Sequence, residues 1–383
     1  MLRRILLAAS DSGRMRQLVT SAPVARGVVA RYVAGDTATD AVAVAGELRE
    51  AGLLVTLDHL GEDTRDARQA DAVTGEYTAL LASLAAAGLT AGAATEVSVK
   101  PTAVGLGLAD HGEKTATENI SRICAAARAA GTTVTVDMED HSHVDATLRI
   151  ARALRAEFAD LGCVIQSQLR RSAADCAALA TAGSRVRLCK GAYNAPQDVA
   201  FTSRAEVDLS YVRCLRALMA GDGYPMLATH DPRLIEIAAA QAHLTGRAAG
   251  DFEYQMLYGI RPAEQRRLAA GGAKMRVYVP YGSDWYGYLV RRLAERPANL
   301  AFFARSLASR GSPAALLSLA RSRLAVGSQP WPLPGPLCRF PTLFRPGPRS
   351  APPGPPPPSP HPLLACPAAA PPAGAGGGGR VEA

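Results

Sequence analysis

Leu53-Leu54-Val55-Thr56-Leu57-Asp58 sets the pattern of this chain, because it is a short apolar run, rich in strand-forming residues, that ends on a carboxylate. Seven similar runs follow, separated by segments rich in Ala, Leu, Arg and Glu that are each long enough for a helix. The expected strands are Leu53–Asp58, Ala94–Lys100, Thr132–Met138, Val164–Gln168, Val186–Cys189, Pro225–Thr229, Asp251–Leu257 and Lys274–Pro280. Eight strands alternating with helices over about 230 residues are typical of an α/β protein with a (β/α)8 barrel.

The ends of these runs allow a test of the barrel prediction. Active sites in such barrels lie at the carboxyl ends of the strands, so polar residues should gather there. All eight runs do end in polar residues: Asp58-His59, Ser98-Val99-Lys100, Asp137-Met138-Glu139-Asp140, Gln166-Ser167-Gln168, Arg187-Leu188-Cys189-Lys190, Thr229-His230-Asp231, Glu253-Tyr254-Gln255 and Tyr278-Val279-Pro280-Tyr281. Eight such endings favour an active site over simple solubility.

Three regions differ in composition. We expect N-terminal helices in residues 1–50, the catalytic barrel in residues 51–310, and a low-complexity tail of Pro, Ala, Gly and Arg in residues 311–383. Residues 328–383 contain 18 of the 27 prolines. Such a segment cannot bury a core, so the tail is expected to be disordered.

The net charge of +8 does not indicate a nucleic-acid partner. Residues 305–383 contain eight arginines, no lysine and one glutamate, and so account for +7 of that charge. The rest of the chain is nearly neutral, so its charge gives no electrostatic argument for a nucleic-acid partner.

The seven cysteines are scattered without a C-x-x-C pair, which argues against a zinc site and a disulfide framework. A reducing compartment, the cytoplasm, is therefore expected. The apolar run at the N-terminus becomes polar at Ser10, and no later stretch approaches eighteen consecutive apolar residues. Any membrane association would be peripheral.

Lys100 is the first candidate site residue. On its run, Val97 and Val99 alternate with Ser98 and Lys100, so the lysine is expected to point into the barrel mouth. A desolvated ammonium needs a partner there, either a carboxylate such as Asp137 or a substrate anion. The alternative is a salt bridge at the rim.

The stretch Asp137-Met138-Glu139-Asp140-His141-Ser142-His143 is dense in acids and imidazoles. A metal site is nevertheless not expected, because adjacent residues on a strand point to opposite faces and other strand ends supply cations. Arg187-x-x-Lys190-Gly191-Ala192-Tyr193 adds two cations and a small step where backbone N–H groups can approach a phosphate or a flavin. A Schiff-base lysine is the alternative interpretation.

The stretch from Trp285 to Pro297 reads as a helix. Tyr288, Arg291, Arg292 and Glu295 then share one face, where two guanidinium groups can bind a small carboxylate and the glutamate can orient one of them. A solvated amphipathic helix is the alternative.

Seven motifs occur together in this order: Val97-Ser98-Val99-Lys100, Asp137-Met138-Glu139, Arg187-Leu188-Cys189-Lys190-Gly191-Ala192-Tyr193, Thr229-His230-Asp231, Phe252-Glu253-x-Gln255-Met256-Leu257-x-Gly259, Tyr278-Val279-Pro280-Tyr281-Gly282 and Arg291-Arg292-Leu293-x-Glu295-Arg296. In motifs and spacing, about residues 30–305 resemble bacterial monofunctional proline dehydrogenase. The resemblance implies a distorted (β/α)8 barrel that holds FAD without a covalent bond, with the last helix over the barrel mouth.

The resemblance also implies roles for single residues. Arg291 and Arg292 would bind the carboxylate of L-proline, Lys100 would be a further cationic contact, and Glu295 would orient an arginine. Asp137 would hold Lys100 or its neighbours, Tyr278 would pack against the pyrrolidine ring, and Arg187 would lie near flavin N5. The residues expected to hold FAD are Met138, Gln166, Lys190, Gly191, Ala192, Thr229 and His230.

The implied reaction is hydride transfer from C5 of L-proline to flavin N5, which gives 1-pyrroline-5-carboxylate, with a quinone as the final acceptor. A cytoplasmic protein with an optional peripheral contact at the inner membrane fits this reaction. Two alternatives remain open: a Schiff-base aldolase using Lys190 or Lys100, and a non-catalytic barrel whose Pro-rich tail binds partners.

The C-terminal tail departs from the family pattern. Its residues are mostly encoded by G/C-rich codons, which suggests translation in a shifted frame as a hypothesis. The nucleotide sequence around codon 304 tests it.

Overall fold

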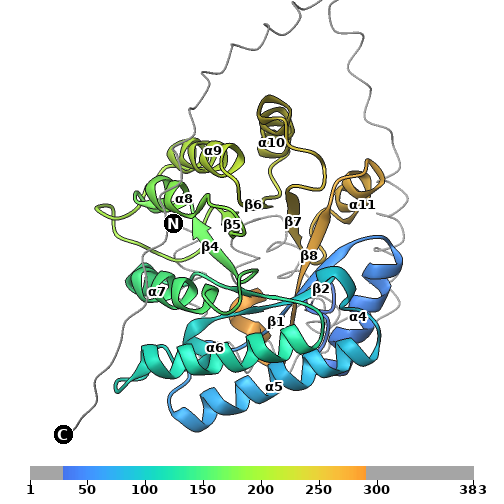
Figure 1. Cartoon of the computed structure of the whole chain (residues 1–383), viewed down its shortest axis with the longest axis vertical. Coiled ribbons are helices and arrows are strands. Elements are labelled where there is room, and N and C mark those ends of the chain that lie inside the picture. The colour runs from blue at the N-terminus through green and yellow to red at the C-terminus, as the bar shows by residue number, and fades with distance from the viewer. Residues whose placement is uncertain (1–28, 290–383) are drawn as a thin grey trace, which may run out of the picture. The chain divides into compact units, whose positions relative to one another are not determined.

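A computed structural model describes residues 29–289 of the chain, and residues 1–28 and 290–383 lie outside that description. Within the described part, eight parallel strands close into a barrel in which each strand pairs with the next and β8 pairs with β1 (Figure 1). The strands are β1 (Leu54–His59), β2 (Thr95–Val99), β3 (Val134–Val136), β4 (Gly162–Gln166), β5 (Arg185–Cys189), β6 (Tyr224–Ala228), β7 (Glu253–Leu257) and β8 (Met275–Tyr281). The predicted (β/α)8 barrel is confirmed.

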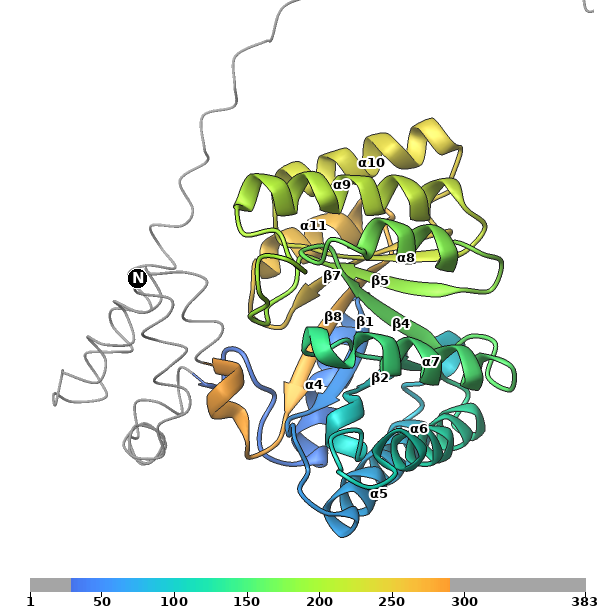
Figure 2. The same ribbon diagram turned by 90° about the vertical axis from the view of Figure 1, so that its left-hand side faces the viewer.

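Helices surround the barrel, as Figures 1 and 2 show. They are α4 (Ala38–Glu50), α5 (Ala67–Ala86), α6 (Gly112–Ala129), α7 (Val144–Arg155), α8 (Ser172–Leu179), α9 (Arg204–Ala220), α10 (Pro232–Thr245) and α11 (Pro262–Ala270). Short 3-10 turns, η1 (Ala91–Ala93), η2 (Pro101–Val104) and η3 (His141–His143), lie in the connections. None of the helices within residues 29–289 has the length and apolar character needed to cross a membrane.

Strand bounds differ from the predicted runs mainly at β3 and β4. β3 contains only three residues, although Asp137 N continues the pairing by donating to Val99 O at 2.9 Å. β4 begins two residues earlier than predicted, at Gly162, which pairs with Thr135 on one side and Arg185 on the other. A Cβ at Gly162 would lie 2.6 Å from the Thr135 hydroxyl, so a glycine fits this crowded position.

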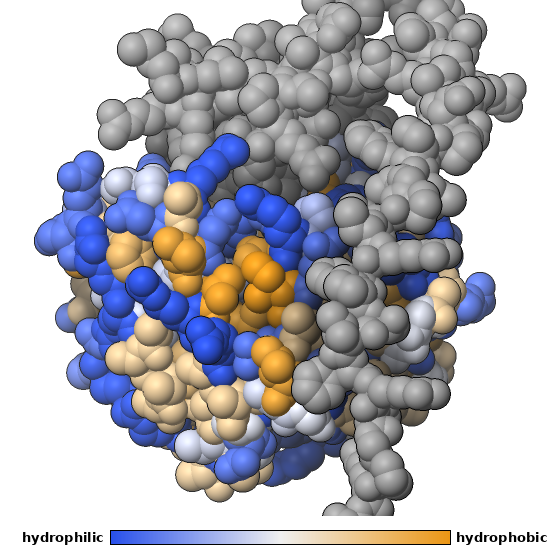
Figure 3. All heavy atoms as spheres, turned by 90° about the horizontal axis from the view of Figure 1, so that it is seen from above, coloured by the Kyte–Doolittle hydropathy of each residue, from blue (hydrophilic) through white to orange (hydrophobic). Residues whose placement is uncertain are grey.

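The hydrophobic core lies between the strands and the helices. Outward-facing strand residues alternate with inward-facing ones, and Val55, Leu57, Val97, Val99 and Val277 are fully buried against the helix layer. The parallel strands are therefore covered on this face, as parallel sheets require. On the outer side, Leu209, Ile237 and Leu244 of α9 and α10 are exposed, and Figure 3 shows apolar atoms among hydrophilic ones on that face.

A second, smaller apolar cluster joins the two ends of the described chain. Tyr32 and Val33 pack with Leu60 and with Trp285 and Leu289 of the helical residues 285–289. The backbone reinforces this contact, because Ala34 N donates to Pro280 O and Gly282 N donates to Gly35 O, both at 2.9 Å.

The close approach of two backbones completes this contact. A Cβ at Gly259 would clash with the carbonyl oxygen of Arg31, so only a glycine fits there. The domain boundaries at residues 50 and 310 stay predictions, although Ala41 and Ala45 of α4 share the core of the barrel.

Candidate active site

The inward-facing side chains of the barrel strands are largely charged. Four carboxylates lie among four cations, and none of these eight side chains is more than 12% exposed: Asp58, Glu96, Asp137, Glu253, Lys100, Arg185, Arg187 and Arg276. Buried charges are costly unless they are paired and hydrogen-bonded. Here acids and bases balance, so the interior is close to neutral.

Glu96 is at the centre of this interior and is fully buried. Its Oε2 accepts from Arg185 Nη2 at 2.7 Å, and its Oε1 lies 3.5 Å from Arg187 Nη2 and 3.9 Å from Arg276 Nε. Thr56 Oγ1 donates to the same Oε1 at 2.9 Å. Burial alone would raise the pKa of Glu96, but its three arginine neighbours hold it at about 2. The carboxylate is therefore charged at neutral pH.

Glu253 and Arg276 form the second ion pair of this layer. Arg276 Nε donates to Glu253 Oε1 at 2.7 Å, and Gln255 Nε2 donates to the same oxygen at 2.6 Å. The other end of this amide, Gln255 Oε1, accepts from Arg187 Nε at 2.6 Å. Gln255 thus links Glu253 to Arg187 through a neutral group.

Arg187 occupies the next position toward the carboxyl ends of the strands. Its Nη1 donates to Asp137 Oδ1 at 2.7 Å and to Ser98 Oγ at 2.8 Å. Asp137 Oδ2 accepts from Tyr278 Oη at 2.7 Å, and the Tyr278 ring lies 5.2 Å from the guanidinium carbon. Burial, and then Asp137, raise the pKa of Tyr278 well above its usual value. Arg187 is therefore fixed by neighbours on several strands, and its charge is matched by a buried carboxylate.

Lys100 forms a separate pair with Asp58. Nζ lies 2.5 Å from Oδ1 and 2.6 Å from Oδ2 of this carboxylate. Burial would lower the pKa of Lys100, but Asp58 and Asp137 raise it. Burial raises the pKa of Asp58 to about 6 against the opposing effect of the ammonium. The prediction of a direct pair between Lys100 and Asp137 is wrong, because Asp58 on the neighbouring strand takes the ammonium. Asp137 instead holds a neighbour of Lys100, since Ser98 Oγ donates to its Oδ1 at 2.8 Å, and it is also engaged by Arg187 and Tyr278.

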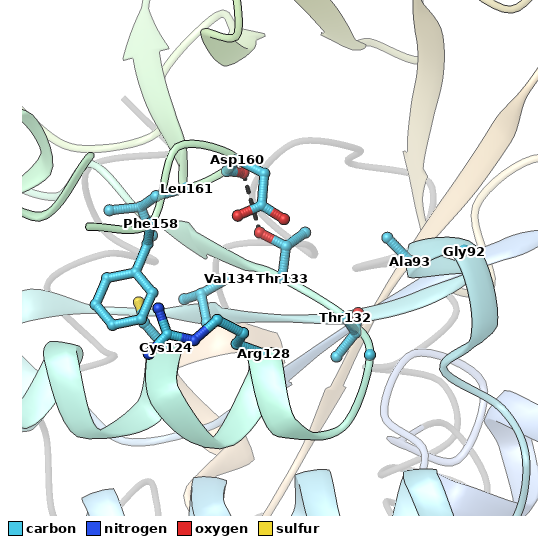
Figure 4. Close-up of a pocket in the computed structure, with 11 residues that line it drawn as sticks. Gly92, Ala93, Cys124, Arg128, Thr132, Thr133, Val134, Phe158, Asp160 and Leu161 are labelled. Carbon is cyan, nitrogen blue, oxygen red and sulfur yellow. Dashed lines mark hydrogen bonds between the residues drawn. The ribbon is translucent and has the colours of Figure 1, made fainter. Parts of the chain in front are cut away.

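The described residues also contain a pocket of about 380 Å³, but it lies elsewhere (Figure 4). It is lined by Thr132 and Thr133, which precede β3, and by Arg128, which stacks on the Phe158 ring at 4.7 Å. Thr133 Oγ1 donates to Asp160 O there at 3.0 Å. These residues lie at the amino-terminal ends of the strands, the end that usually serves stability in such barrels.

Comparison with known proteins identifies the family. A family model described as proline dehydrogenase matches residues 41–305. The chain belongs to this family. It is 37% identical over 307 residues to proline dehydrogenase 1 of Bacillus subtilis (strain 168), which covers 80% of this chain and 99% of the relative. It is 39% identical over 281 residues to proline dehydrogenase of Deinococcus radiodurans, which covers 72% and 89%.

Solved structures agree in fold. Proline utilization A from Bdellovibrio bacteriovorus, inactivated by N-propargylglycine, has a TM-score of 0.65 at 27% identity and covers 76% of this chain. Proline utilization A from Bradyrhizobium japonicum has a TM-score of 0.59 at 25% identity and covers 76%. The chain spans only 35% and 33% of those two longer chains. Residues 306–383 lie beyond the region matched by the proline dehydrogenase model.

The site residues expected from the family fall on two arcs of the barrel rim. Met138 and Gln166 follow or end β3 and β4, Lys190 to Ala192 follow β5, and Thr229 and His230 follow β6. Lys100 follows β2 and Tyr278 lies on β8, on either side of β1. The residues expected to hold FAD thus line one arc, and those expected to contact proline line the other. Arg187 lies on β5 and Asp137 follows β3, so both belong to the first arc, and their side chains meet at 2.7 Å.

The side-chain amide of Gln166 uses only its N–H group for hydrogen bonding within the described residues. Its Nε2 donates to Glu139 O at 2.7 Å, whereas its Oε1 is buried and makes no hydrogen bond within residues 29–289. Met138 is also buried. An orphaned buried acceptor at the carboxyl end of a barrel strand fits a ligand with an N–H group, such as a flavin ring.

The loop after β5 contains a lysine held by two ion pairs, followed by a glycine with positive φ. Lys190 Nζ lies 2.6 Å from Asp208 and 3.2 Å from Asp231, which also caps α10. Gly191 has a φ of 102°, and a Cβ there would lie 2.5 Å from the Gln168 side chain. Gly191 and Ala192 are half-buried, so the backbone of this step is accessible from one side.

His230 is held in one orientation. Its Nε2 accepts from Leu257 N at 2.9 Å, so the neutral ring carries its hydrogen on Nδ1. Arg261 Nη1 donates to His230 O at 2.7 Å, and the preceding Thr229 is buried. These contacts fix the ring at the carboxyl end of β6.

Both lysines proposed for a Schiff base are paired with carboxylates. Lys190 contacts two aspartates, and Asp58 holds Lys100 in its charged form. A Schiff-base lysine must react as the neutral amine. This geometry therefore disfavours the aldolase alternative.

The arginine helix is described only in part. Residues 285–289 are helical, as predicted, and Tyr288 is buried. Arg291, Arg292 and Glu295 lie outside the described residues, so their expected roles stay predictions. Within residues 29–289, no group of three or more His, Cys, Asp or Glu side chains is placed to hold a metal ion.

The sequence reasoning missed Glu96, Arg276 and the role of Glu139. Glu139 is buried, and its carboxylate accepts from Thr102 N at 2.9 Å and Thr102 Oγ1 at 2.6 Å, so it joins the connections after β2 and β3. The sequence did contain a pattern that points to Glu96 and Arg276. Glu96 lies two residues before Ser98, and Arg276 lies two residues before Tyr278. Period-two alternation continued backwards from each polar strand end would have found them.

Proposed function

We propose that this protein is an FAD-dependent enzyme that oxidises L-proline to 1-pyrroline-5-carboxylate. The observation that carries the proposal is the cluster of buried Arg187 and Asp137 with half-buried Tyr278 at the carboxyl ends of the strands, in a chain of the proline dehydrogenase family. FAD, when bound, supplies the hydride acceptor for such a reaction.

The donor set fits a flavin. Gln166 Oε1 offers an unused acceptor within residues 29–289, and the half-buried Gly191 leaves backbone accessible. We assign FAD binding to this arc, with Met138, Lys190, Ala192, Thr229 and His230 as the other contacts. Arg187 would lie near the reacting part of the ring, where a fixed positive group stabilises developing negative charge.

Charge balance supports the expected substrate receptor. Asp58 already neutralises Lys100 and accepts two hydrogen bonds from its ammonium. One of the three N–H donors of Lys100 then remains for another acceptor. A carboxylate entering the barrel mouth would therefore need cations from elsewhere. We assign this role to Arg291 and Arg292, with Glu295 orienting one of them, and Tyr278 to contact with the pyrrolidine ring.

We further propose a quinone as the electron acceptor. Quinones of respiratory chains reside in the lipid phase, so this choice implies a cytoplasmic protein with a peripheral contact at the inner membrane. Dye-linked and quinone-linked turnover with L-proline, measured with and without vesicles, tests the acceptor and the contact together.

The decisive experiment is anaerobic addition of L-proline to the purified full chain. We expect a yellow protein whose flavin absorbance is bleached by L-proline and returns with an oxidant. A protein that binds no flavin, or a flavin that L-proline leaves oxidised, contradicts the proposal. Borohydride in the presence of a keto acid should trap no adduct.

The substrate receptor needs its own test. Arg291→Ala should raise KM for L-proline at least tenfold while the flavin remains bound, because a bidentate contact to the carboxylate is lost. Arg310→Ala removes the same charge outside the region matched by the family model and should leave KM unchanged. An unchanged KM in Arg291→Ala would exclude the assigned receptor.

A further inference from the structure

Glu96 differs from the other buried carboxylates because it lies close to three arginines. It accepts from Arg185 at 2.7 Å, lies 3.5 Å from Arg187, and lies 3.9 Å from Arg276. Its contact with Arg187 is on Nη2, the guanidinium nitrogen that neither Asp137 nor Gln255 holds.

The acceptors around Arg187 fix the plane of its guanidinium group. Gln255 binds Nε, Asp137 and Ser98 bind Nη1, and Glu96 binds Nη2 from beneath. A planar group held at all three nitrogens cannot rotate without breaking a hydrogen bond. Glu96 is the one of these acceptors that is both fully buried and shared with other arginines.

We propose that Glu96 is a positioning residue for the reaction: it orients Arg187 and reduces the positive charge that this arginine presents at the carboxyl ends of the strands. The inference rests on the proposed function, because that function brings a flavin next to Arg187. Glu96 lies a layer beneath the rim residues and acts through Arg187 rather than by touching substrate or flavin.

The physical consequence is a shift in flavin potential. Glu96→Gln preserves the shape of the side chain but leaves four buried cations facing three carboxylates. Reduction adds negative charge to a flavin, so an excess of positive charge near it favours the reduced form. The midpoint potential of the bound flavin should therefore become more positive. KM for L-proline should stay within about twofold, because Glu96 does not contact the substrate.

Glu253→Gln is the matched control. Glu253 is as deeply buried and its loss removes the same charge, but its ion pair is with Arg276, and it reaches Arg187 only through the neutral amide of Gln255. A glutamine at 253 can still accept from Gln255. We expect Glu96→Gln to shift the midpoint potential at least twice as far as Glu253→Gln does. Glu96→Asp keeps the negative charge, so its shift should be at most half that of Glu96→Gln.

A milder variant covers the case in which Glu96→Gln fails to fold. Thr56→Val removes the hydroxyl that donates to Glu96 Oε1 at 2.9 Å and leaves every charge in place. The carboxylate then loses a partner that offsets part of its negative charge, so the midpoint potential should move slightly in the opposite direction.

The outcomes separate this inference from the proposed function. If the starting protein binds no flavin, or proline does not reduce it, the proposed function fails and this inference fails with it. If proline reduces the flavin but Glu96→Gln and Glu253→Gln shift its potential equally, or Thr56→Val leaves it unchanged, only the inference on Glu96 is overturned.

Discussion

Glu139→Gln should change how the stability of this protein depends on pH. The carboxylate is 3% exposed and bridges two connections at the barrel mouth through Thr102. Burial raises the pKa of Glu139 from an ordinary 4.5 to about 7, although the hydrogen bonds from Thr102 oppose that rise. A glutamine can accept from Thr102 N and donate to the threonine hydroxyl, so both contacts can persist in the variant.

Whether stability rises or falls with pH depends on which state of the chain, folded or unfolded, binds the proton more tightly. Between pH 4.5 and 7 the folded chain holds a proton on Glu139 and the unfolded chain does not, so this group makes stability fall as the pH rises. One pH unit corresponds to 1.36 kcal/mol, so the whole window amounts to about 3 kcal/mol. The variant lacks this contribution. The advantage of the native chain over Glu139→Gln should therefore shrink by about 3 kcal/mol between pH 4 and pH 7.5.

Urea unfolding at several pH values in this range, without added FAD, measures the difference. Thr102→Val is a useful companion, because it removes the hydroxyl that donates to Glu139 at 2.6 Å. The pKa of Glu139 should then rise further, and the loss of stability should continue above pH 7. A difference between the native chain and Glu139→Gln that stays constant across the range would refute the reasoning.

Two further predictions concern the barrel interior and the junction of the chain ends. Lys100→Met should cost about 3–5 kcal/mol in urea unfolding, because Asp58 keeps a buried charge without its partner; adding Asp58→Asn should recover part of the loss, and a double variant no more stable than the single one would contradict the pairing. Gly259→Ala should lower the thermal stability by at least about 2 kcal/mol more than Gly272→Ala. Both glycines have positive φ, 72° and 84°, but only Gly259 touches another backbone, that of Arg31, so equal losses would contradict that close contact.

Much of the fold is visible in the sequence because strands and helices follow from local patterns. The apolar run Leu53–Asp58 becomes β1 nearly as predicted, since β-branched residues and a polar ending suffice to define a covered parallel strand. Thr132–Met138 is a less accurate prediction. Only three of its residues form β3, because strand length depends on pairing with the neighbouring strands, and β2 pairs in register with Val134, Thr135 and Val136 alone.

The site is partly visible for the same reason. Lys100, Asp137, Arg187 and Tyr278 could be expected at one end of the barrel, because parallel strands bring their carboxyl ends together, and the structure gathers them there.

Which carboxylate pairs with which cation was not predictable. Asp58 and Asp137 lie on either side of β2, and the choice of Asp58 by Lys100 depends on the stagger of the closed barrel and on competition from Arg187. Glu96 was missed because it lies inside an apolar run, where a charge is tolerable only when cations from distant strands surround it.

The junction of the chain ends has a consequence for the order of folding. Tyr32 and Val33 leave the ribosome early, but their partners between Gly259 and Leu289 are synthesised more than 220 residues later. The same delay applies to β1, which must wait for β8 before the barrel can close. Contacts of such long sequence separation form slowly, and unclosed strand edges are prone to aggregation. A nascent chain that stops before β8 therefore keeps an open barrel edge and an undocked apolar segment, so chaperone dependence during synthesis should decrease only when the last strand has emerged.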